Sequence, residues 1–290
     1  MIFGSPKKNI NNTKENEEVQ EQIVMLDMDK MVDFREGQPF SMYKEEKARQ
    51  IKESIARFGI LEPIIVRNIE NDKYEVISGR HRVRYSKELG NKKAPSIIKN
   101  VDDDVARLIM LETNLCQRED IPLSEKGLAY KMQLETLKKI REKVPAHSEQ
   151  VNSIDIVASK SNDSRATIQR LIRLTELIKP LQEKVGEQIS LLAGVELSYI
   201  SPEEQEIINK VIEDKKLKIS RYIASHLRTV KGNITEQTVL ELFSLKEKTE
   251  KFTGKINKET VKKYKKHFKT NDDFNELISK LLEEYFEKTA

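Results

Sequence analysis

Tyr74-Glu-Val-Ile-Ser-Gly-Arg-His-Arg-Val-Arg-Tyr85 is the stretch of sequence around which the rest of the chain can be arranged. Its first four residues are typical of a short buried strand, and Ser78-Gly79 suits a turn. From Arg80 onward the sequence predicts a helix that ends at Gly90, because glycine is favoured at helix C-termini. A strand, a tight turn and a helix are therefore expected in direct succession.

This succession is suited to holding phosphate groups. A turn of small residues at a helix start leaves free N–H groups and the positive end of the helix dipole facing one point. Four basic side chains, Arg80, His81, Arg82 and Arg84, follow Gly79 within the first helical turns. The alternative is a basic helix start that is simply solvated, and the motif alone leaves both interpretations open.

The composition limits the class of protein. At 290 residues the chain is long enough for two or three domains, each with its own core. The formal net charge is only +4, so local charge clusters say more about partners than the total does. A single cysteine, Cys116, excludes an internal disulfide and a CxxC metal site, and the four histidines lack metal-ligand spacing. No apolar run approaches the roughly 20 residues that span a bilayer, so we expect a cytoplasmic protein without a membrane partner.

An α/β unit is predicted around the opening stretch. Asn71-Asp72 forms a turn between residues 64–67 and 74–77, which indicates a hairpin. Residues 45–58 carry apolar side chains at spacings of three and four, which predicts an amphipathic helix that ends at Gly59. Two further strands are expected at residues 23–26 and 95–98, followed by a helix that Asp102-Asp-Asp104 caps.

Helices dominate from Pro122 onward, where no further strand is predicted. The expected fold class is therefore α+β: a small mixed α/β domain, then an all-α domain and a helical C-terminal region. The expected boundaries are 1–22 for a flexible tail, 23–120 for the α/β domain, 121–232 for the helical domain, and 233–290 for a basic linker with a final helix.

Residues 154–177 have the pattern of a helix-turn-helix, in which two short helices flank the polar turn Lys160-Ser-Asn-Asp163. Asn162 lies where glycine is common, and asparagine tolerates a left-handed conformation. Hydroxyl groups suit phosphates, and Gln or Arg side chains suit base edges, so the outer face of the second helix is a candidate DNA-binding surface. An ordinary helical hairpin with a charged face is the alternative. The candidate DNA-binding residues are Ser164, Arg165, Thr167, Gln169, Arg170 and Arg173.

Glu112-Thr-Asn114 and Gln117-Arg118 follow the start of the capped helix. A carboxylate and an amide two residues apart can share a hard cation such as Mg²⁺ with a nucleotide phosphate. The alternative is a last helical turn whose polar side chains are in solvent. Cys116 is expected to be a bystander, since no base is close to it in sequence.

The C-terminal segment combines opposite charges with an apolar stripe. Residues 246–269 hold ten lysines against three glutamates, which suits nonspecific phosphate binding or a solvated face. Residues 272–287 carry apolar side chains at helical spacing, and an uncovered stripe of this kind needs a partner. Since a homodimer reads paired half-sites, a double-stranded DNA target with an inverted repeat is expected. The residues predicted to form the dimer are Leu277, Leu281, Leu282 and Tyr285.

Taken in order, four motifs resemble those of the ParB family of DNA-partition proteins. They are Gly59-Ile-Leu-Glu-Pro-Ile64, Gly79-Arg-His-Arg-Val-Arg84, Glu112-Thr-Asn-Leu-Cys-Gln-Arg-Glu-Asp120 and the helix-turn-helix, and the likeness covers about residues 23–230. It implies that domain 23–120 binds CTP with Mg²⁺ and hydrolyses it slowly, and that domain 121–232 binds a centromere-like DNA site. It also implies a dimeric clamp that closes on nucleotide binding and slides on DNA, and a partner ATPase of the ParA type.

The resemblance assigns roles to individual residues. Gly79, Arg80, His81 and Arg82 would hold the triphosphate, Glu112 and Asn114 would serve the metal and the phosphates, and Gln117 and Arg118 would lie at a moving hinge. Two positions depart from the family pattern. Arg80 stands where an acidic residue is usual, and Thr113 separates a Glu–Asn pair that is usually adjacent.

Two other functions fit parts of the sequence. A transcriptional or nucleoid-occlusion regulator could use the same helix-turn-helix without nucleotide turnover, and the altered spacing in Glu112-Thr-Asn114 motivates this alternative. Sulfiredoxin and a free-serine kinase resemble the same α/β domain. Sulfiredoxin chemistry, however, needs a cysteine where this chain has Arg80, and neither enzyme needs a helix-turn-helix.

Overall fold

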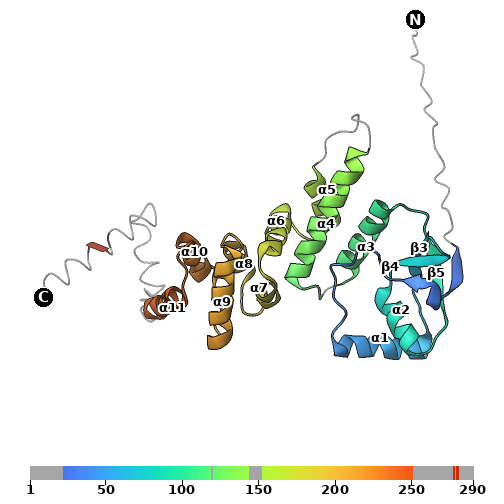
Figure 1. Cartoon of the computed structure of the whole chain (residues 1–290), viewed down its shortest axis with the longest axis horizontal. Helices are drawn as coiled ribbons and strands as arrows, with labels where there is room; N and C mark the ends of the chain where they lie inside the picture. Colours follow the sequence, from blue (N-terminus) through green and yellow to red (C-terminus); the bar gives the residue numbers. More distant parts are fainter. Residues whose placement is uncertain (1–21, 119, 144–151, 251–276, 278, 281–290) are drawn as a thin grey trace, which may run out of the picture. The chain divides into compact units, whose positions relative to one another are not determined.

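A computed structural model describes residues 22–118, 120–143, 152–250, 277, 279 and 280 (Figure 1). Its contacts divide the chain into two compact units, Met1–Glu236 and Gln237–Ala290. The first unit contains a five-stranded sheet followed by helices, which confirms the predicted α+β class. The predicted boundary between residues 23–120 and 121–232 lies inside this unit and stays a prediction.

The sheet is mixed, with strand order β1-β5-β3-β4-β2. β1 pairs antiparallel with β5, β3 pairs parallel with β5 and antiparallel with β4, and β2 pairs parallel with β4. The strands are β1 (Ile23–Asp27), β2 (Met31–Val32), β3 (Ile64–Ile69), β4 (Lys73–Ser78) and β5 (Lys93–Ile98). Four of them were expected from the sequence, whereas β2 has only two residues and is too short to show an alternating pattern.

The hairpin of β3 and β4 is confirmed, with Ile69 paired to Lys73. Asn71 and Asp72 in its turn both have positive φ angles, 64° and 53°. Asparagine and aspartate tolerate this region better than other side chains, because their short polar groups can hydrogen-bond locally. The hairpin leads β4 directly into Gly79 and the helix that follows.

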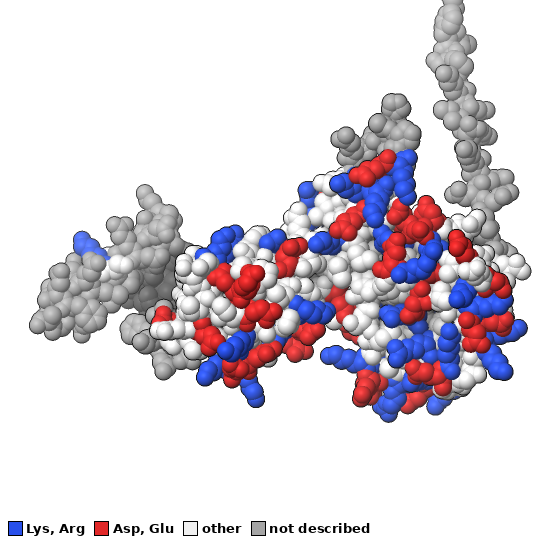
Figure 2. Space-filling model, in the orientation of Figure 1, with Lys and Arg blue, Asp and Glu red and all other residues white. Residues whose placement is uncertain are grey.

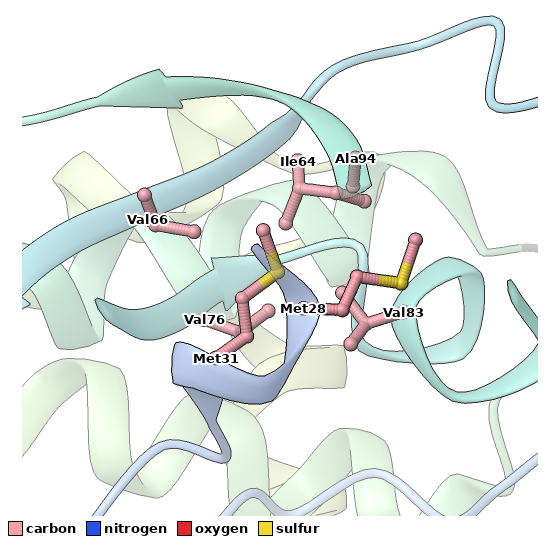
Figure 3. Packing of buried hydrophobic residues seen from close by; sticks show 7 residues of the cluster. All are labelled: Met28, Met31, Ile64, Val66, Val76, Val83 and Ala94. Carbon is pink, nitrogen blue, oxygen red and sulfur yellow. The ribbon is translucent and has the colours of Figure 1, made fainter. Parts of the chain in front are cut away.

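Each face of the sheet carries its own apolar cluster. Successive residues of a strand point to opposite faces, so Val76 joins one cluster and Ile77 the other. The first cluster, drawn in Figure 3, packs the sheet against Val83 of the following helix and against Met28 of η1 (Met28–Lys30). Its members are Met28, Met31, Ile64, Val66, Val76, Val83 and Ala94. The second cluster comprises Phe34, Phe40, Ile77, Ala106, Met110, Leu111 and Ala129.

Three helices accompany the sheet. α1 (Glu45–Phe58) ends at Gly59 with a φ of +72°, and α2 (Arg80–Glu88) lies beside it in Figure 1. α3 (Asp103–Gln117) starts at Asp102, whose carboxylate accepts a hydrogen bond from the N–H of Val105 at 2.8 Å. The predicted caps are thus confirmed, but the apolar face of α1 is narrower than expected, since Phe58 is 61% exposed.

The helical part begins with α4 (Leu123–Glu142), which packs against both α3 and α6. Gly127 makes this packing close, because a Cβ atom there would lie 2.1 Å from the carbonyl oxygen of Leu171. The remaining helices of the first unit are α5 (Ser153–Lys160), α6 (Arg165–Arg173), α7 (Lys179–Lys184), α8 (Leu191–Leu197), α9 (Pro202–Lys215) and α10 (Arg221–Thr229). None of the helices among the described residues is both long and apolar enough to cross a membrane.

Several helix boundaries differ from those predicted. The second helix of the helix-turn-helix was expected to reach Leu177, but it ends at Arg173 and a 3-10 turn follows. α7 was not predicted, and α11 (Glu236–Glu250) occupies part of the segment predicted as a linker. Of the predicted C-terminal helix, residues 277, 279 and 280 are helical, while Leu281, Leu282 and Tyr285 lie outside the described residues.

Candidate functional site

Gly79 fixes the start of α2. Its φ of +98° lies in the left-handed region, and an added Cβ would meet Ile64 Cδ1 at 2.7 Å and Arg82 Nε at 3.2 Å. Gly79 is the N-cap of α2, and no side chain caps this helix. The N–H groups of the first turn, which have no partner within a helix, are therefore free to hold an anion.

A cavity of about 430 Å³ opens at this helix start. Three arginines line it against one carboxylate, that of Glu62, so the cavity suits a ligand with several negative charges. Seven of the eight residues predicted to bind nucleotide or form the hinge contribute to it. They are Gly79, Arg80, His81, Arg82, Asn114, Gln117 and Arg118.

Arg80 and Arg82 already have partners in this structure. Arg82 Nη1 donates to the carbonyl oxygen of Glu62 at 2.5 Å and lies 3.2 Å from its carboxylate. Burial lowers the pKa of Arg82, and the charge of Glu62 opposes that shift. Arg80 Nε lies 3.4 Å from Asp33 Oδ2. A ligand at the start of α2 would therefore compete with Glu62 and Asp33 for the two guanidinium groups.

The pKa of His81 lies well below its ordinary value, which favours the neutral imidazole near pH 7. Burial, followed by the nearby charges of Arg118 and Arg80, lowers its pKa from 6.5 to about 4. The ring stacks on Tyr43 with 4.0 Å between centroids and 29° between planes. Its Nδ1 is buried and has no hydrogen-bond partner in the described structure.

Glu112 and Asn114 do not share a cavity. Successive helical residues are about 100° apart, so two residues of separation place them on different sides of α3. Asn114 faces the cavity at the start of α2 and donates from Nδ2 to the carbonyl oxygen of Met110 at 2.8 Å. Glu112 instead lines a second cavity of about 550 Å³. The predicted joint role of these two residues at Mg²⁺ stays a prediction, and in this structure their side chains line different cavities.

The second cavity connects α3 and α4 with the helix-turn-helix. Glu112 Oε1 accepts hydrogen bonds from Lys160 Nζ at 3.0 Å and from Gln133 Nε2 at 3.3 Å. Asp163, in the turn of the helix-turn-helix, accepts from the Tyr130 hydroxyl at 2.7 Å and pairs with Lys126 of α4 at 2.6 Å. Burial and the bond to Asp163 raise the pKa of Tyr130, so its hydroxyl stays a donor. α3 thus lies between a candidate anion site and the candidate DNA reader.

The second helix of the helix-turn-helix is present as α6, and part of its predicted outer face is exposed to solvent. Ser164 is the N-cap of α6 and accepts from the N–H of Thr167 at 3.2 Å, so both predicted hydroxyl residues take part in capping. Arg165 pairs with Asp155 at 3.4 Å. Gln169 and Arg170 are exposed, and Arg170 forms no hydrogen bond or ion pair with any described residue. Basic and acidic groups are interspersed on the face drawn in Figure 2, so charge alone does not mark a DNA-binding surface there.

Arg173 and Asn162 adopt arrangements that differ from those expected from the sequence. Arg173 donates from Nε and Nη2 to the hydroxyl and carbonyl oxygens of Ser198, at 2.9 and 2.7 Å, and lies 4.1 Å from the centroid of the Tyr199 ring. Its side chain thereby joins α6 to the end of α8. Asn162 does not adopt a positive φ, and hydrogen bonds between Ser161 and Asp163 close the turn instead.

Sequence reasoning missed several residues that shape these sites. Tyr43 lies outside any periodic segment, and nothing in its neighbourhood indicates a contact with His81. The roles of Tyr130 and Gln133 depend on partners 33 and 21 residues away in sequence. Gly127 gave a usable signal, because glycine inside a predicted helix often marks a close approach.

Comparisons with known proteins relate this chain to one family. A model of the ParB N-terminal domain matches residues 12–115. A nucleoid occlusion protein from Listeria monocytogenes is 31% identical over 209 residues, which cover 71% of this chain and 68% of that protein. The crystal structure of C-terminally truncated Caulobacter crescentus ParB complexed to the centromeric parS site is 20% identical and covers 71% of this chain and 98% of that one, with a TM-score of 0.45. The ParB chain in the corresponding complex with CTP-gamma-S is also 20% identical. That match covers 72% of this chain and 97% of the ParB chain, with a TM-score of 0.31. On the identity and coverage of the Listeria relative, together with the matching domain model, this chain belongs to the ParB family.

Proposed function

We propose that this chain is a nucleotide-gated DNA-binding protein that takes part in DNA partition or nucleoid occlusion, with CTP as the nucleotide. The observation that carries this proposal is the cavity at the uncapped start of α2, where Arg80, Arg82 and Arg118 outnumber the one acid, Glu62. Family membership adds that the helix-turn-helix reads DNA, and the relatives named nucleoid occlusion proteins are consistent with that role.

A triphosphate suits this cavity for electrostatic reasons. Free N–H groups and the helix dipole of α2 favour negative charge, and guanidinium groups form bidentate hydrogen bonds to phosphate oxygens. Phosphates would also replace the carbonyl and carboxylate of Glu62 as partners of Arg82. Mg²⁺ would be held mainly by the phosphates, since it keeps most of its ligands from water and substrate oxygens.

Nucleotide and DNA are coupled, in this proposal, through α3. One side of this helix presents Asn114 to the nucleotide cavity, and the other presents Glu112 to Lys160 of α5. A shift of α3 on nucleotide binding would alter the contacts that hold the helix-turn-helix. Differential binding of a few kcal/mol is enough to move such a two-state equilibrium.

The proposed function implies three partners, which are DNA, a second copy of this chain and an ATPase. The target would be double-stranded DNA with an inverted repeat, bound by a homodimer that forms through the C-terminal helix. A ParA-type ATPase would be a further partner in partition, and the protein would act in the cytoplasm on DNA. Sequencing of DNA that copurifies with the protein from cells would reveal one inverted repeat if this is so, and no enriched sequence if it is not.

Nucleotide identity is tested by competition. Labelled CTP is bound to the intact protein, and unlabelled CTP, ATP, GTP and UTP are added in turn. We expect CTP to displace the label at the lowest concentration, because CTP is the nucleotide proposed for this cavity. Equal displacement by all four nucleotides would contradict a CTP-specific site.

A DNA-binding regulator without nucleotide turnover is the second candidate function. The position of Glu112 favours it, since this carboxylate is bonded to Lys160 and Gln133 on the side of α3 away from the nucleotide cavity. Phosphate release from CTP, measured with and without the selected DNA, separates the two functions. DNA-stimulated release would exclude this candidate, and binding without release would support it.

A further inference from the structure

Tyr43 contacts two candidate functional elements at once. It lies just before α1 and lines the cavity at the start of α2. Its ring stacks on His81 of α2 at 4.0 Å, and the guanidinium carbon of Arg118, the C-cap of α3, lies 4.4 Å from the same ring centroid. One aromatic ring therefore touches both the anion-binding helix and the end of the helix that leads toward α4.

Arg118 is held in place by this segment rather than by a close acid. It is only 8% exposed, and its Nη1 donates to the carbonyl oxygen of Ser41 at 3.1 Å. The nearest carboxylate, Asp120, is 4.0 Å from Nε, and this Nε has no hydrogen-bond partner in the described structure. Stacking against Tyr43 and the bond to Ser41 are thus the main contacts that orient the guanidinium.

His81 contacts the Tyr43 ring as well, from the start of α2. It lines the cavity together with its neighbours in sequence, Arg80 and Arg82. Because the imidazole is neutral, it can stack on the phenol ring without the cost of burying a charge. A ligand that fills the cavity would move or fix the imidazole, and with it the stacked ring.

We propose that Tyr43 is a positioning residue that transmits occupancy of the cavity to Arg118 through the stack of His81, Tyr43 and Arg118. This inference rests on the proposed function, because it assumes that a nucleotide fills the cavity and that DNA binding responds to it. The stack is a continuous chain of contacts from the start of α2 to the end of α3. Its disruption uncouples the two sites without removing either of them.

The test measures the dissociation constant of the selected DNA with and without CTP, at a CTP concentration that saturates each variant. The ratio of the two constants is the coupling factor, which typically lies between about 5 and 150. We expect a ratio in this range for the unchanged protein and a ratio within about twofold of one for Tyr43→Leu, which keeps an apolar side chain but removes the ring. Tyr43→Phe keeps the ring and should restore the ratio.

Tyr222→Leu is a matched control, because Tyr222 forms another tyrosine–histidine contact, 4.2 Å from His226, on α10. It should leave the ratio unchanged. Should Tyr43→Leu fold poorly, Arg118→Lys removes the planar group while keeping the charge, and it should lower the ratio in the same way. A full coupling factor in Tyr43→Leu or Arg118→Lys, or loss of CTP binding in Tyr43→Leu, would overturn this inference while leaving the proposed function intact. A ratio of one in the unchanged protein would instead refute the proposed coupling of nucleotide to DNA, and this inference with it.

Discussion

Lys160 Nζ lies 3.0 Å from Glu112 Oε1 and so joins the first helix of the helix-turn-helix to α3. The two side chains are 57% and 34% exposed, so the pair contributes little to stability, roughly 0.2–1 kcal/mol as for other exposed ion pairs. Its significance is positional, because it connects the candidate coupling helix α3 to α5, between residues 48 positions apart in sequence.

Reversing the charge of either partner should break this connection, and reversing both should restore it. We expect Glu112→Lys and Lys160→Glu each to lower the free energy of unfolding by up to about 1 kcal/mol, and the double variant to recover most of that loss. Urea denaturation of the four proteins measures this. Lys138→Glu is the control, since Lys138 is 78% exposed and 4.0 Å from its partner Glu142. Purely additive losses in the double variant would show that the pair does not interact.

Gly79→Ala should destabilise the protein more than Gly90→Ala. Both glycines have positive φ, so alanine costs roughly 1–2 kcal/mol of backbone strain at either position. Only at Gly79 would the new Cβ also clash, 2.7 Å from Ile64 Cδ1, which adds about 1–3 kcal/mol. Thermal unfolding of the two variants tests this difference. Equal melting temperatures would mean that the start of α2 relaxes without cost.

Alanine substitution should mainly weaken DNA binding at Arg170 and mainly lower stability at Arg173. Arg170 is exposed and unpartnered among the described residues, so Arg170→Ala should leave stability within about 0.5 kcal/mol and weaken binding of the selected DNA by about 1–3 kcal/mol. Arg173 bonds Ser198 and stacks on Tyr199, so Arg173→Ala should lower stability by about 2 kcal/mol. Chemical denaturation and DNA titration of both variants check this. A stable Arg173→Ala with weaker DNA binding would place that side chain at the DNA instead.

Stability should fall as the pH drops from about 6.5 to about 4, in part because of His81. Its pKa is about 4 in the folded chain and near 6.5 in the unfolded one, so between these values only the unfolded chain takes up the proton. The folded state therefore loses stability as the pH falls through this window, and His81 adds no further change below about pH 4. In His81→Gln the dependence should be shallower by up to about one proton, as measured by urea denaturation at several pH values. An unchanged slope would show that the pKa of His81 is the same in the folded and unfolded chains.

The sequence predicted those parts of the fold that depend on local rules. The hairpin turn at Asn71-Asp72, the C-terminus of α1 at Gly59 and the cap at Asp102 all follow from backbone preferences of the residues themselves. The two-residue strand β2 and helix α7 depend on tertiary contacts, and short segments of this kind carry no periodic signal.

The candidate site was predictable to the same extent. The order Gly79-Arg-His-Arg82 located the start of α2, because a local turn and a helix dipole are properties of the sequence itself. The sides of α3 on which Glu112 and Asn114 lie, and the contact of Tyr43 with His81, depend on how distant segments pack. Nothing in the residues around Tyr43 determines which helix approaches it.

We propose that the arginines at the start of α2 hold a nucleotide triphosphate, and titration calorimetry of CTP into three proteins tests this claim. Arg82 lines the cavity, whereas Arg84, two residues further along the same helix, is exposed and pairs with Glu88 at 3.2 Å. We predict that the unchanged protein and Arg84→Ala bind CTP with affinities within about threefold of each other, and that Arg82→Ala loses at least about tenfold, as expected for a charged hydrogen bond worth about 1.5–3 kcal/mol. Equal affinities in Arg82→Ala and Arg84→Ala, or no heat of binding in the unchanged protein, would contradict the claim.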